Sequence, residues 1–123
     1  MCIGGGSFVC EVLLNSTFNS DISNWDVSNV ESFQGMFNGN AAFNADISKW
    51  NTSKAKTMQG MFKDAINFNQ DISDWDTSKV ESFVSQFEGA EQFNQAIGKW
   101  NTGSSKLDGM QGMFQRAKSF AQD

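Results

Sequence analysis

One motif recurs along almost the whole chain and limits what it can fold into. Phe68-Asn69-Gln70-Asp71-Ile72-Ser73-Asp74-Trp75 recurs with small changes at spacings of 25 residues, starting at Phe18, Phe43 and Phe93. A fixed period of this length is the sequence signature of a tandem array, in which each unit buries its apolar face on its neighbours. The chain is therefore predicted to be a stack of similar units.

The period divides the 123 residues into repeats. Residues 1–17 are irregular and are predicted to be a leader and a degenerate cap. Residues 18–119 are predicted to hold four repeats, at 18–42, 43–67, 68–92 and 93–119. The fourth is two residues longer, which we attribute to Gly103-Ser104. Residues 120–123 match the start of a repeat and are interpreted as a truncated fifth.

The second half of each repeat has the spacing of a helix. Val30, Phe33 and Phe37 lie at i, i+3 and i+7. Ser28 followed by Glu31 is a capping box, which marks a helix start. The corresponding apolar residues in the other repeats are Ala55, Met58 and Phe62, Val80, Phe83 and Phe87, and Leu107, Met110 and Phe114.

The first half of each repeat resembles a strand with leucine-rich-repeat spacing. Ile22, Trp25, Val27 and Val30 follow that spacing, and a strand over about 24–28 would turn Trp25 and Val27 inward. Stacked strands need less room than packed helices, so such a stack must curve with its strands on the concave side. The predicted fold is an α/β repeat, a right-handed, leucine-rich-repeat-like solenoid of about four coils, each with a short strand and a short helix.

Three nearly uniform columns are predicted to be structural ladders. Aromatic columns are expected to form internal spines. The asparagine column is expected to be an internal ladder that satisfies backbone groups at the turn, because buried polar groups need partners. The ladders are Phe18, Phe43, Phe68 and Phe93, Trp25, Trp50, Trp75 and Trp100, and Asn19, Asn44, Asn69 and Asn94.

The outward face of the predicted strands is the candidate partner-binding surface. Strand alternation would leave its side chains in solvent, and concave faces of repeat proteins commonly bind partners. A solvated face with no binding role is the alternative. The residues are Asn24, Asp26, Lys49, Asn51, Asp74, Asp76, Lys99 and Asn101.

Two further columns allow other readings. Asp21, Asp46 and Asp71 would either cap local turns or, with carboxylates stacked about 5 Å apart, attract calcium. Thr52, Thr77 and Thr102 resemble an ice-binding ladder, but the predicted register turns them inward. We therefore expect turn capping and no metal site.

Composition excludes several classes of function. The absence of histidine removes Ser-His-Asp and Cys-His nucleophilic systems, no phosphate-binding loop is present, and so neither an enzyme nor a cofactor is expected. A net charge of −5 argues against a nucleic-acid partner, and no apolar run reaches membrane-spanning length. Cys2 and Cys10 are either paired or free.

The motif F-N-x-D-I-S-x-W-D-x-S-x-V-x-x-F/M-x-G-M-F-x-G-A, from Phe18 to Asp123, resembles the BspA-like leucine-rich-repeat group, a bacterial surface protein repeat also found in mycoplasma-type lipoproteins. The resemblance implies an extracellular or cell-surface, adhesin-like solenoid. Ala96, Gly98 and the two extra residues of the fourth repeat depart from the pattern.

These observations predict a non-enzymatic interaction module that binds a protein or a glycan through its polar face. The alternative is a structural subunit that stacks end to end into a filament, because unpaired coil edges invite association. Ice or calcium binding is a third, weaker reading.

Overall fold

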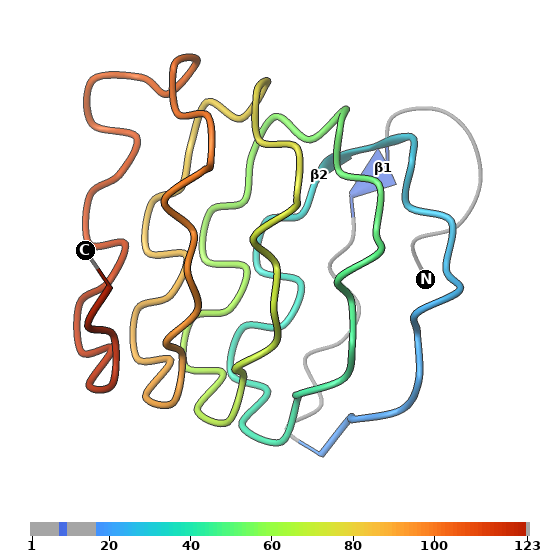
Figure 1. Cartoon of the computed structure of the whole chain (residues 1–123), viewed down its shortest axis with the longest axis vertical. Coiled ribbons are helices and arrows are strands. Elements are labelled where there is room, and N and C mark those ends of the chain that lie inside the picture. The colour runs from blue at the N-terminus through green and yellow to red at the C-terminus, as the bar shows by residue number, and fades with distance from the viewer. Residues whose placement is uncertain (1–7, 10–16, 123) are drawn as a thin grey trace.

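The repeats lie against one another as successive turns of the chain (Figure 1). The structure is a computed structural model, which describes residues 8–9 and 17–122. Its two strands, β1 (Phe8–Val9) and β2 (Val30–Ser32), are parallel, with Phe8 opposite Val30 and Val9 opposite Ser32. Parallel bridges from Ser32 to Thr57 and from Thr57 to Ser82 continue this ladder across the next two repeats. The predicted leader and cap at 1–17, with Cys2 and Cys10, lie almost entirely outside the described residues.

The predicted α/β fold is wrong. The described residues contain no helix, and β2 lies inside a segment for which the spacing predicts one. The predicted strand over 24–28 consists of turns and irregular chain. A right-handed, leucine-rich-repeat-like solenoid with a strand and a helix in every coil is therefore not what this chain forms. Almost all of each repeat is turns and irregular chain.

Two residues with left-handed backbone, four positions apart, interrupt the predicted helix of each repeat. Gly35 and Gly39 have φ angles of 64° and 76°, whereas a helix needs φ near about −63°. Small residues in the Gly35 column would also allow neighbouring repeats to approach closely. However, a Cβ on Gly60, in the same column, would meet nothing within 4 Å. The backbone angle, and not close packing, therefore accounts for glycine in this column. The other residues with positive φ are Gly60 and Asp64, Ser85 and Gly89, and Gly112 and Arg116.

Backbone hydrogen bonds in these segments alternate between two directions. The amide of Phe33 donates to the carbonyl of Thr57 in the next repeat, at 3.0 Å. The amide of Met36 instead donates back to Phe33, closing a turn at 3.2 Å. This alternation continues through the corresponding segments of the first three repeats, so there it is the next repeat, and not a helix, that satisfies half of the amides.

The burial pattern was predicted correctly although the element was not. Val30, Phe33, Met36 and Phe37 are at most 1% exposed. Two consecutive four-residue turns place apolar side chains three and four residues apart on one side, as a helix does. Periodicity alone cannot separate these two backbones.

The two extra residues of the fourth repeat lie elsewhere than predicted. The amide of Ser105 donates to Thr102, as that of Val80 does to Thr77, so Ser105 takes the place of Val80. The two extra residues instead lie in a turn that is closed by a 2.8 Å hydrogen bond from the amide of Gly109 to the carbonyl of Lys106. Leu107, which we expected in the core, is at the tip of this turn and is fully exposed.

Candidate interaction surfaces

All eight residues of the predicted partner-binding face are exposed, although none lies in a strand. They form two columns that run across the repeats. We call this set the polar face. Its first column is Asn24, Lys49, Asp74 and Lys99, and its second is Asp26, Asn51, Asp76 and Asn101.

The second column holds the backbone of a turn in each repeat. The Asp76 carboxylate accepts hydrogen bonds from the amide and the hydroxyl of Ser78, at 2.9 and 2.6 Å. The hydroxyl bond is the largest of the causes that lower the pKa of Asp76 below its ordinary value, followed by the amide bond. Corresponding amide bonds run from Ser28 to Asp26, from Ser53 to Asn51, and from Gly103 to Asn101. These side chains are therefore held in fixed positions on the surface.

The first column is more loosely held. Lys99 pairs with Asp74 at 2.9 Å, but both side chains are largely exposed, at 71% and 83%. Exposed ion pairs contribute roughly 0–1 kcal/mol. This column therefore leaves its charged groups accessible to a partner.

The aspartate column caps turns, as expected. Asp21, Asp46 and Asp71 each accept a hydrogen bond from the amide two residues later, at 2.9 to 3.0 Å. Within the described ranges no three potential metal-ligating side chains cluster together. The geometry supports the turn-capping interpretation over a calcium site.

The aromatic ladders extend through the stack. Phenylalanine rings stack from Phe18 to Phe43, Phe68 and Phe93, with centroids 5.8 to 6.4 Å apart. Trp50, Trp75 and Trp100 stack at 6.4 Å with nearly parallel rings. Trp25 packs partly buried against the same core. These columns are fully engaged in packing.

The asparagine ladder satisfies backbone groups as predicted, but it lies at the surface and is not internal. The Asn19 side chain accepts a hydrogen bond from the amide of Asn44, at 2.7 Å. Asn44 and Asn69 repeat this contact to the amides of Asn69 and Asn94. Asn44 is half-buried and the other three are exposed, so the ladder joins repeats from outside.

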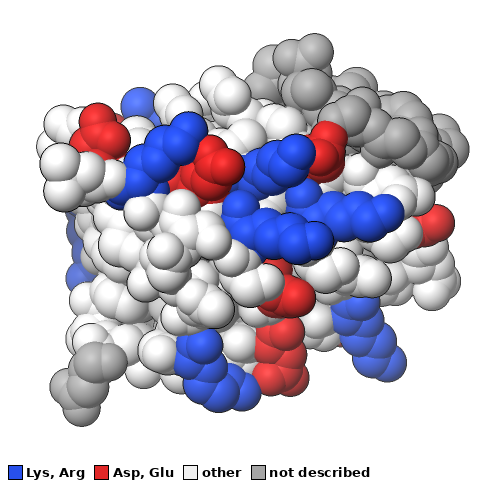
Figure 2. Space-filling view, turned by 90° about the horizontal axis from the view of Figure 1, so that it is seen from above, with Lys and Arg blue, Asp and Glu red and all other residues white. Residues whose placement is uncertain are grey.

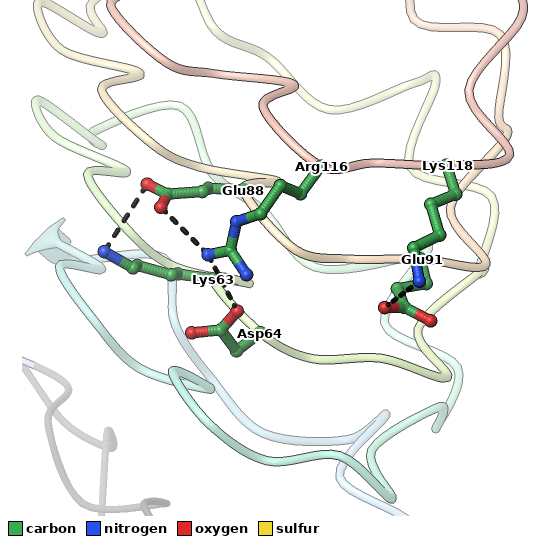
Figure 3. Close-up of polar contacts among 6 residues, drawn as sticks. All are labelled: Lys63, Asp64, Glu88, Glu91, Arg116 and Lys118. Atoms are coloured by element: carbon green, nitrogen blue, oxygen red, sulfur yellow. Dashed lines mark hydrogen bonds and ion pairs between the residues drawn. The ribbon is translucent and has the colours of Figure 1, made fainter.

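A network of ion pairs, not anticipated from the sequence, links the last three repeats (Figure 3). Arg116 contacts Glu88 at 3.1 Å and Asp64 at 3.4 Å, and Lys63 approaches Glu88 at 3.4 Å. Hydrogen bonds from the Ser85 hydroxyl and then from Arg116 lower the pKa of Glu88. The sequence signal that could have predicted this network is the opposite charge of Lys63 and Glu88, which occupy equivalent positions in successive repeats.

Another charged surface mixes lysines and carboxylates (Figure 2). Lys56 pairs with Glu31 at 2.6 Å, and Lys106 pairs with Glu81 at 2.8 Å. These four residues alternate in sign along one column, and Lys56, Glu81 and Lys106 line a shallow hollow with Lys79 and Ser104. The alternation neutralises the column and gives no site selective for anions.

The fourth repeat has an exposed end, whose individual residues were not identified from the sequence. Met110 is 41% exposed, whereas Phe83, its equivalent in the third repeat, is fully buried. We call this region the end surface. It surrounds a mainly apolar cavity of about 220 Å³ lined by Ile97, Trp100, Thr102, Met110, Met113, Phe114 and Phe120.

Comparison with known proteins identifies the family. Residues 10–123 match the family described as "Mycoplasma protein of unknown function, DUF285". The chain belongs to this family. The matched description does not name the BspA-like leucine-rich-repeat group. No curated protein matches, and no solved structure does. In the part of the chain that the structure describes, no helix has the length and apolar character needed to cross a membrane.

Proposed function

We propose that this DUF285 chain is a non-enzymatic interaction module of a cell-surface or secreted protein, and that it binds a protein partner through the polar face. The observation that carries the proposal is the exposure of all eight polar side chains in two columns, one of them fixed by turns. Polar groups that are positioned before binding lose less conformational entropy on contact.

The chemistry of the face favours a protein over a glycan or another small ligand. Sites for small ligands are concave and lined with apolar and aromatic side chains. The large exposed apolar residues among those described are Ile66, Leu107 and Met110, and none is aromatic. A broad face of carboxylates, amides and ammonium groups instead suits the polar rim of a protein interface and gives charge-based selectivity.

A binding screen with charge-reversed variants tests this proposal. The immobilised chain is probed with a panel of purified extracellular proteins and with a glycan array. Asp26→Lys combined with Asp76→Lys should abolish binding of any protein hit. The matched control, Asp21→Lys with Asp71→Lys, changes the charge equally and also removes two turn caps, but it lies outside the polar face.

The comparison is valid when both double variants melt at the same temperature. Loss of binding in the first and retention in the second supports the polar face. Equal binding by the two variants, or hits confined to glycans, would contradict the proposal.

A second candidate function is structural, with chains stacking end to end into a filament. It is favoured by the end surface, where side chains that are buried in earlier repeats are exposed. Exposed apolar patches next to unpaired backbone commonly mark association sites.

A further inference from the structure

The second left-handed position of each repeat forms a column that runs across the stack. Its occupants alternate between glycine and a charged residue, in the order Gly39, Asp64, Gly89 and Arg116. Their φ angles lie between 57° and 76°. A Cβ disfavours this conformation, which glycine adopts without strain. Aspartate and arginine therefore occur at two positions where the backbone itself favours glycine.

The two charged members of this column contact each other across a whole repeat. Asp64 lies in the second repeat and Arg116 in the fourth, 52 residues later. The Nη2 atom of Arg116 lies 3.4 Å from Oδ1 of Asp64 and 3.1 Å from Oε1 of Glu88, in the repeat between them. Figure 3 shows the guanidinium group between the two carboxylates. The pair therefore joins two repeats that are not adjacent, whereas the backbone hydrogen bonds between described repeats join neighbours.

Gly89, the member of the column between these two, leaves the space that their contact needs. A Cβ on Gly89 would overlap Oδ1 of Asp64 and would lie 3.2 Å from its Cγ. A methyl group there would therefore push the carboxylate away from Arg116. At Gly39, in the same column, a Cβ would meet nothing within 4 Å. The two glycines share a backbone conformation and differ in what a side chain would displace.

A contact between non-adjacent repeats changes how a stack of repeats unfolds. The stability of such a stack is approximately the sum of each repeat's own stability and of the contacts between neighbours. Under that rule, the second repeat responds to the opening of the fourth only through the third. The Asp64–Arg116 pair adds a direct connection, because opening of the fourth repeat removes a contact from the second.

We infer that Asp64, Gly89 and Arg116 form a salt-sensitive clamp that couples the opening of the second and fourth repeats. The two charged residues supply the attraction, and Gly89 supplies the gap through which they meet. The side chains of Asp64 and Arg116 are 43% and 57% exposed, so dissolved ions screen the pair. The clamp therefore weakens as the salt concentration rises. It contains no residue of the polar face and no residue that lines the cavity of the end surface, so it is independent of both proposed functions.

A double-mutant cycle measures the coupling between Asp64 and Arg116. Asp64→Gly and Arg116→Gly, alone and together, are unfolded with urea at about 20 mM and at about 1 M salt. At low salt their effects on the unfolding equilibrium constant should deviate from a simple product by about threefold, and at high salt they should multiply. The matched control cycle combines Asp64→Gly with Lys118→Gln. Lys118 also lies in the fourth repeat, but it pairs with Glu91 at 2.8 Å, so these effects should multiply at both salt concentrations.

Gly89→Ala tests the gap. With Asp64 present, this change strains the backbone and also displaces the carboxylate, whereas in the Asp64→Gly background it strains the backbone alone. It should therefore raise the unfolding equilibrium constant about threefold more in the natural sequence than in that background. Gly39→Ala is the matched control, because Gly39 has a φ of 76° and an open Cβ position. Its effect should be the same in both backgrounds.

The outcomes separate the parts of the clamp. Effects of Asp64→Gly and Arg116→Gly that multiply at low salt would overturn the inference, and coupling that persists at about 1 M salt would overturn its salt sensitivity. Equal effects of Gly89→Ala in the two backgrounds would contradict the role given to Gly89. A Gly89→Ala chain that folds only in the Asp64→Gly background supports that role, and one that folds in neither assigns the loss to backbone strain and contradicts it.

Discussion

The indole nitrogen of Trp75 donates a 3.0 Å hydrogen bond to the carbonyl oxygen of Ile47, which lies 28 residues earlier. The same carbonyl accepts the amide of Trp50 at 3.2 Å. One oxygen thus closes a turn within its own repeat and anchors the ring of the next. The pairs Ile22–Trp50 and Ile72–Trp100 repeat this contact. Each tryptophan therefore supplies apolar volume and also sets the register between repeats.

Trp75→Phe should lower the free energy of unfolding by about 1–3 kcal/mol. It removes one buried hydrogen bond and part of the stacked ring volume. Urea denaturation followed by circular dichroism measures the change. Trp25→Phe is the comparison, since Trp25 is partly buried and its indole bonds to no described residue. A loss in Trp25→Phe as large as that in Trp75→Phe would argue against the role given to the hydrogen bond.

Gln86→Met should stabilise the fold by about 1–2 kcal/mol. Gln86 is fully buried, its Nε2 contacts the sulfur of Met58 at 3.4 Å, and its Oε1 has no hydrogen-bond partner. Methionine occupies the equivalent positions 36, 61 and 113. The reverse change, Met61→Gln, should destabilise by a similar amount. Thermal melts of both variants test this, and a lower midpoint for Gln86→Met would refute it.

Gly60→Ala should cost about 1–2 kcal/mol of stability. The φ angle at Gly60 is 62°, where a Cβ is strained even though no atom lies within 4 Å of its position. Gly98→Ala is a matched control, because Gly98 is equally open and has no positive φ. Removing backbone freedom from the unfolded chain should leave that variant neutral or slightly more stable. Equal chemical-denaturation midpoints for the two variants would exclude backbone angle as the cause.

Stability should fall on acidification below about pH 4. Bonds from serine hydroxyls and amides hold the pKa values of Asp26, Asp71 and Asp76 below their ordinary value of 3.8. A carboxylate with a lowered pKa stabilises the fold fully above its unfolded pKa, and this contribution is lost as pH falls through the folded pKa. Melting temperatures measured from pH 7 to pH 2.5 should show the decline.

Replacing these three aspartates with asparagine should flatten that decline. Asn51 and Asn101 already accept the same amide bond at the turn that Asp26 and Asp76 cap. An asparagine at position 71 offers the same oxygen to the amide of Ser73, so the caps survive while the titrating groups are removed. An unchanged pH profile in the triple variant would assign the acid sensitivity to other carboxylates, such as Glu88.

The sequence predicted the burial and the local role of individual residues better than it predicted the secondary structure. Phe33 and Phe37 are buried as their spacing predicts, and Asp71 caps a turn as its residue type predicts. The predicted backbone between them was wrong, because the spacing of the apolar residues did not reveal the left-handed residues at Gly35 and Gly39. Asp64 and Arg116 also adopt this conformation, which few residues other than glycine favour, so composition gave no warning there.

The polar face and the end surface differ in how they were found. The polar face follows from alternation along the repeat, and its residues are exposed even though the predicted strand is absent. The end surface depends on which amides have a repeat beside them, and no local pattern records that. The place of Leu107 shows the same limit, since the sequence assigned the extra residues to Gly103-Ser104, and only the hydrogen bond from Ser105 to Thr102 moves them to the turn that carries Leu107.

By itself, the 25-residue period determined that similar units recur, which side chains in each unit are apolar, and that the eight residues of the polar face are exposed. The tertiary structure decided the path of the backbone. Half of the amides in the turn segments are satisfied by the neighbouring repeat and not by their own, so the local pattern is compatible with a helix until that neighbour is in place.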